Sequence, residues 1–152
     1  MRTLALLSLL LVSCSDSSEP PRKGGSGGHH HESPRGGTLV EVGAHVAQVD
    51  LVLDPATGEL HAYVMDGHAT KAVRIPQKML AATLTVDGED LTLALEAVED
   101  GLSGETVGDT SHFRAVSEAL KGKERFSGRI GPIRVYGKDF DAIAFTYGRS
   151  RP

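Results

Sequence analysis

The chain has 152 residues with a formal net charge of −4, and this length fits one domain. The mildly acidic balance argues against nucleic acid or an anionic lipid surface as the partner. Cys14 is the only cysteine, so a disulfide within the chain is excluded and a folded domain must depend on its core.

The amino terminus has the order of features of an export signal. Arg2 gives a positive charge, and residues 4–12 form an apolar run that is too short to span a bilayer. The run leads into Leu-Val-Ser-Cys at 11–14, which resembles the lipobox of bacterial lipoproteins. That resemblance implies cleavage before Cys14, a diacylglycerol on its thiol and an acylated amino group. An ordinary secretory signal with a chance cysteine is the alternative.

We therefore expect residues 1–13 to be a lipoprotein signal peptide and Cys14 to carry the lipid anchor. Removal of Arg2 leaves 15 basic and 20 acidic residues, a net charge of −5. Ser15 follows Cys14, so the residue next to the cysteine is not an aspartate. By resemblance to the enterobacterial sorting rule, this favours the periplasmic face of the outer membrane.

Residues 14–37 are predicted to be a flexible, lipid-anchored linker. In residues 15–37, Gly, Ser and Pro make up 14 of 23 positions, and histidine is the only ring-bearing residue type besides proline. Such a segment buries too little apolar surface to offset the entropy lost on ordering. As a flexible coil it would span about 25 Å.

His29, His30, His31 and Glu32 form the most prominent cluster of this linker. Three imidazoles and a carboxylate can chelate Cu(II), Ni(II) or Zn(II). An engineered tag does not fit, because the cluster lies between the lipobox and the domain. A flexible chelator binds weakly since it must be ordered on binding. A polar linker of biased composition is the alternative.

The domain is expected at residues 38–148, where apolar and polar residues begin to alternate. The turn at 54–59 predicts a hairpin, with Pro55 at its first corner and Gly58 in a left-handed conformation. A four-residue loop sets apolar residues opposite one another: Leu53 and Leu60, Leu51 and Ala62, Val49 and Val64.

The same register predicts a second candidate metal site. If pairing ran further, Ala47 would face Asp66 and His45 would face His68. Two histidines and a carboxylate could hold a metal ion. Against this, Asp66-Gly67 is itself a turn signal.

A second hairpin is predicted around Asp87-Gly88, a preferred two-residue turn. It sets Leu84 against Leu91 and Leu80 against Leu95. Residues 71–75 read as a short strand that ends at Pro76.

Residues 112–121 give the one helical signal. Ser111 is a candidate cap, and Phe113, Val116 and Leu120 recur at helical spacing. Further strands are expected at 124–130, 133–137 and 140–148, broken at 131–132 and 137–139. The sequence thus predicts an all-β fold: an antiparallel β-sandwich or partly open barrel of eight or nine short strands with one short helix.

The chain carries none of the common catalytic spacings, so we do not expect an enzyme. Asp109, Ser111 and His112 are close in sequence, but neighbours at a helix start point in different directions. We interpret them as a capping serine and a surface histidine.

Four segments resemble a family of small bacterial lipoproteins of the planctomycete type: "GGTL" at 36–39, "LVLDPATG" at 51–58, "YVMDGHA" at 63–69 and "GDTSHFRAVSEALKG" at 108–122. The likeness covers most of residues 36–147 and implies a lipid-anchored envelope domain. A related His-Gly-Gly opening in the amino-terminal parts of some heavy-metal efflux adaptors implies metal handling. Arg35 stands where that histidine would be, so the triplet four residues earlier would have to replace it.

These observations favour a lipid-anchored periplasmic binding or accessory module. The cofactor that they suggest is copper or another divalent transition metal. A structural or protein-interaction lipoprotein of the envelope, with no small ligand, is the alternative. The expected partners are the membrane, through the lipid anchor, and an envelope protein.

Overall fold

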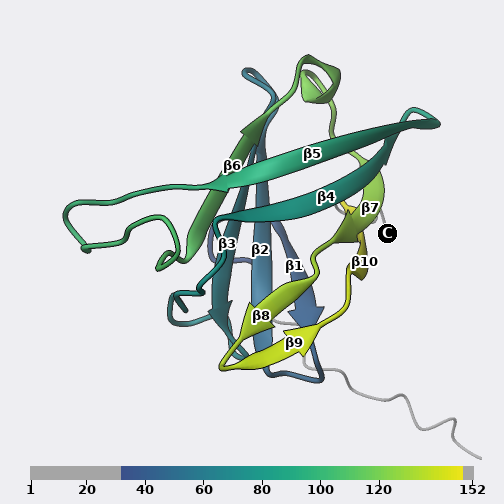
Figure 1. The fold of residues 1–152 in the computed structure, drawn as a ribbon. Helices are drawn as coiled ribbons and strands as arrows, with labels where there is room; N and C mark the ends of the chain where they lie inside the picture. Colours follow the sequence, from purple (N-terminus) through teal and green to yellow (C-terminus); the bar gives the residue numbers. More distant parts are fainter. Residues whose placement is uncertain (1–31, 149–152) are drawn as a thin grey trace, which may run out of the picture.

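The computed structural model describes residues 32–148, which form one antiparallel sheet of eight strands and a small hairpin (Figure 1). The strands are β1 (Thr38–Val42), β2 (Ala47–Asp54), β3 (Glu59–Asp66), β4 (Met79–Val86), β5 (Glu89–Ala97), β6 (His112–Val116), β7 (Phe126–Ile130), β8 (Ile133–Val135), β9 (Lys138–Phe140) and β10 (Ile143–Tyr147).

The large sheet curls into a nearly closed barrel. Its strand order is β1-β2-β3-β6-β5-β4-β7-β10, and β4 and β5 lie across β1–β3 in Figure 1. The two ends of the sheet approach each other at the seam. The Leu53 N–H of β2 donates to the Tyr147 hydroxyl of β10 at 2.9 Å, and the Gly148 N–H, directly after β10, donates to Thr38 Oγ1 of β1 at 3.3 Å. The predicted all-β fold is confirmed.

Alternating side chains fill the barrel interior, as the period-two pattern requires. Along β3, Leu60, Ala62 and Val64 are fully buried, while the residues between them are only half-buried. Phe113 of β6 is the largest fully buried side chain. Phe140 of β9 packs beside Gly43, so the β8–β9 hairpin covers the barrel end at the β1–β2 turn (Figure 1).

Both predicted hairpin registers are confirmed. In β2–β3 the pairs are Leu53 with Leu60, Leu51 with Ala62, and Val49 with Val64. In β4–β5 they are Leu84 with Leu91 and Leu80 with Leu95. Gly58 is left-handed at φ +75°, and the Asp87-Gly88 turn has φ values of 52° and 87°.

The prediction of a helix at residues 112–121 is wrong. Residues 112–116 form β6, which pairs with β3 and with the end of β5, and only Glu118–Leu120 form a single 3₁₀ turn. The Ser111 hydroxyl donates to Glu105 Oε1 at 2.8 Å instead of capping a helix. Val116 is more than half exposed while Phe113 is buried, so the apolar residues do not share one face.

Two shorter segments also differ from expectation. Residues 71–75 are not a strand and contribute only isolated bridges, Met65 with Ala72 and Ile75 with Thr110. The break expected at 137–139 is instead a turn that leads into β9, which pairs with β8. None of the residues from 32 to 148 form a helix with the length and hydrophobicity of a membrane-spanning segment.

Candidate functional site

Two of the predicted sites fall wholly or mainly outside the described residues. Cys14 and the triplet His29, His30 and His31 precede residue 32, where the described chain begins. Glu32, the last member of the linker cluster, is exposed.

The second predicted metal site does not form. Pairing reaches Ala47 with Asp66 and ends there. Both Asp66 carboxylate oxygens accept hydrogen bonds from Thr70, from its N–H at 2.7 Å and its hydroxyl at 2.8 Å. Within residues 32–148, no three His, Cys, Asp or Glu side chains are grouped so that they could hold a metal, so His45, Asp66 and His68 are not such a group. The turn chemistry of Asp66 explains the difference.

A different set of polar side chains meets on the outer face of β2, β3 and β6. Because Leu60, Ala62 and Val64 face inward, His61 and Tyr63 face outward. The register sets Asp50 of β2 opposite Tyr63 on one side, and His112 of β6 opposite it on the other. We call Asp50, His61, Tyr63 and His112 the outer-face cluster.

The two histidines of the cluster are in direct contact. Nδ1 of His61 lies 2.9 Å from Nε2 of His112. The Tyr63 ring stacks on His112 with centroids 4.3 Å apart and planes 14° apart. A hydrogen bond between these nitrogens needs one donor and one acceptor, so at least one imidazole of the pair is neutral.

Burial lowers the pKa of His112 to about 4, and repulsion from His61 adds to the effect. Burial disfavours the charged imidazolium, and the His61 ring 2.9 Å away disfavours it further. His112 is therefore neutral at neutral pH, with a lone pair on one nitrogen. The unfolded chain takes up this proton near pH 6.5, so the contribution of His112 to stability is present above that pH and lost as pH falls toward 4.

We expect the His112 imidazole signals to stay constant between about pH 7.5 and 5.5 in a nuclear magnetic resonance titration, and to move only near pH 4. A His112 whose signals move near pH 6.5, the ordinary value of a histidine, would contradict the packing described for the cluster.

A short segment before β1 is fastened onto this face; we call residues 33–37 the strap. The Ser33 hydroxyl donates to Asp50 Oδ1 at 2.7 Å and accepts the Gly37 N–H at 2.7 Å. The Arg35 guanidinium lies 4.1 Å from the centre of the Tyr63 ring and 3.8 Å from Asp50 Oδ2. The expected linker, residues 14–37, therefore ends in residues that belong to the domain.

Asp50 is the group that holds the strap. Its side chain is fully buried, and burial raises its pKa, against the lowering effects of the Ser33 hydrogen bond and of Arg35. Its Oδ2 has no hydrogen-bond partner, so the Arg35 cation is what compensates that oxygen. A buried carboxylate without such compensation is costly, which gives the chain a reason to keep the strap in place.

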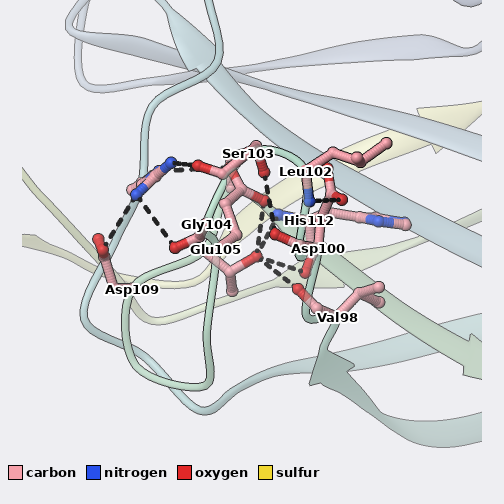
Figure 2. A network of polar contacts seen from close by, with 11 residues as sticks. Val98, Asp100, Leu102, Ser103, Gly104, Glu105, Asp109 and His112 are labelled. Carbon is pink, nitrogen blue, oxygen red and sulfur yellow. Dashed lines mark hydrogen bonds and ion pairs between the residues drawn. The ribbon is translucent and has the colours of Figure 1, made fainter.

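A second network positions the start of β6. The buried Glu105 carboxylate accepts from the Ser111 hydroxyl at 2.8 Å and lies 3.1 Å from Thr110 Oγ1. Thr110 Oγ1 in turn accepts the His112 N–H at 3.1 Å. Figure 2 shows this network, in which the loop from Val98 to Asp109 folds around Glu105.

The outer-face cluster was not predicted from the sequence. His112 was expected at a helix start, and no role was expected for His61. The outward alternation of His61 and Tyr63 was visible in the predicted hairpin. The partner strand β6 was not, because its residues had been assigned to a helix.

The chain was compared with family models, with curated proteins and with solved structures, and none of the three comparisons gave a match.

Proposed function

We propose that the chain is a lipid-anchored binding module of the bacterial cell envelope that handles a divalent transition metal of the copper type. The observation that carries this proposal is the strap. It holds the end of the histidine-bearing linker against the outer face of the barrel, beside the His61–His112 pair.

The strap changes the energetics of the linker histidines. A chelator on a free coil must lose chain entropy when it binds an ion. Here Glu32 is one residue from Ser33, whose hydroxyl is bonded to buried Asp50. One end of the chelating segment is thus held in place before any ion binds, which reduces the entropy lost on binding.

The lipobox-like sequence at Cys14 supports the location in this proposal. A lipid on Cys14 would keep the barrel at a membrane surface, and the linker sets how far away it stands. Several acyl chains give lasting attachment, since each buried CH₂ contributes about 0.8 kcal/mol.

A protein-interaction module remains the second candidate, and exposed apolar side chains favour it. Leu102 is fully exposed on the long β5–β6 loop, and Val107 on the same loop is about half exposed. Val107 and Met79 border a shallow hollow beside Glu96. Under this alternative the barrel would dock through this loop and would need no metal.

The metal proposal predicts that the full chain binds Cu(II) with a Kd in the micromolar range or weaker. Changing His29, His30 and His31 together to alanine should remove the strongest phase of binding in calorimetry. The matched control changes three other linker residues, Ser15, Ser17 and Ser18, to alanine and should leave binding unchanged. Identical isotherms for the triplet variant and the unmodified chain would show that the linker histidines play no part.

A further inference from the structure

We infer that His61 and His112 form a second binding site for a divalent transition metal, on the barrel itself. This inference deepens the proposed function and rests on it for the class of ligand. It differs from the linker site because both donors belong to paired strands of the folded domain.

The distance between the two nitrogens suits one shared ion. Imidazole nitrogens bind such metals at about 2.0–2.1 Å. Two nitrogens 2.9 Å apart that are both this far from one ion subtend about 90° at it. That angle joins neighbouring positions of a square-planar or tetragonal site, the geometry that Cu(II) and Ni(II) prefer.

The donors are held in place before binding. His61 pairs with Arg114 and Tyr63 pairs with His112, so the two histidines are diagonal neighbours on adjacent strands. Tyr63 stacks on His112, and the Thr110 hydroxyl fixes the His112 backbone. An ion that replaces the shared contact displaces the proton between the two nitrogens, which moves to the other nitrogen of its ring, and requires little ordering of the protein.

The charges around the pair also permit a cation. The two arginines that lie nearby, Arg35 and Arg114, each have a carboxylate partner. Arg35 lies 3.8 Å from Asp50, and Arg114 lies 2.8 Å from Glu59. Glu105 adds a further negative charge on the side of His112. With these pairs formed, the local charge does not exclude a divalent ion.

The donor set also limits what the site can bind. Imidazole suits copper, nickel and zinc, whereas calcium and magnesium require oxygen ligands. Within residues 32–148 no third His, Cys, Asp or Glu joins the pair, so water would fill the other positions. We therefore expect moderate affinity and an ion that exchanges readily, as suits transfer more than permanent storage.

The test starts from the full chain in which His29, His30 and His31 are alanine, so that the linker cannot chelate. Added Cu(II) should still bind once per chain in calorimetry and should selectively broaden the His61 and His112 resonances. His61→Ala should weaken this binding by about tenfold or more. Substitution of a residue that only hydrogen-bonds to a metal ligand already lowers metal affinity by at least that much. His68→Ala, at an exposed histidine outside the pair, is the matched control.

His112→Gln is the second variant, because glutamine keeps a polar side chain of similar size on β6 and is a poor copper ligand. It should lose Cu(II) binding while melting close to the unmodified chain. If the triplet variant binds no Cu(II), or binds equally well after His61→Ala, the pair is a hydrogen-bonded contact only and the inference fails. Failure of the proposed linker site gives a different result: the triplet change would then leave the binding of the original chain unaltered.

Discussion

Gly58→Ala is expected to destabilise the barrel severely. The added methyl group meets two obstacles at this position. Gly58 has φ +75°, a conformation that costs a residue with a side chain about 1–3 kcal/mol. A Cβ there would also lie 2.2 Å from the backbone oxygen of Ser117, where β6 ends against the turn. The backbone cannot rotate away as a side chain could, so we expect a further cost of about 1–3 kcal/mol.

Gly88→Ala provides the matched control for the steric part of this cost. Gly88 is also left-handed, at φ +87°, but a Cβ there meets nothing within 4 Å. We expect the control to cost about 1 kcal/mol and the Gly58 variant several times more. In thermal unfolding this corresponds to a fall of roughly 5 °C against roughly 10–20 °C. Equal melting temperatures for the two variants would show that Ser117 does not contact the first hairpin.

The hairpins were predictable because both of their determinants are local. In β2–β3, the turn residues fix the loop length, and a slip of one residue would turn every apolar side chain outward. Pattern and turn chemistry therefore point to the same register. The Gly58 conformation follows from the same four residues, without knowledge of any other strand.

The region around β6 was not predictable in this way. Phe113, Val116 and Leu120 fit a helical repeat, yet the edge of β3 offers residues 112–116 a row of backbone partners. Glu105 also competes for the Ser111 hydroxyl, which a helix would have needed as a cap. Both effects come from residues outside the 112–121 segment that the fold brings against it, and tertiary pairing outweighs weak local preference.

The site depended on the same long-range contacts. Asp50 lies in an alternating pattern that predicts a solvent-facing carboxylate. It is buried because the strap folds back over β2 and places Ser33 and Arg35 on it. His61 contacts His112 only because β6 is a strand paired with β3. With residues 112–121 predicted as a helix, this contact could not be predicted.

Cys14→Ser is expected to abolish lipidation of the chain. Serine has no thiol to accept the diacylglycerol, so the precursor should remain uncleaved or be found free of the membrane. The loss of lipid-borne attachment should be close to complete, because several acyl chains together bind a membrane lastingly and the variant carries none. Ser15→Ala, next to the cysteine, is the control and should leave attachment intact.

The central claim about where this protein acts is that the barrel is carried on a lipid at Cys14. The most direct measurement is the intact mass of the native chain recovered from the membrane fraction. We expect a chain that begins at Cys14 and carries the added mass of a diacylglycerol and an amino-terminal acyl group. A native chain that is found outside the membrane fraction, carries no lipid and is cleaved at another residue would contradict it.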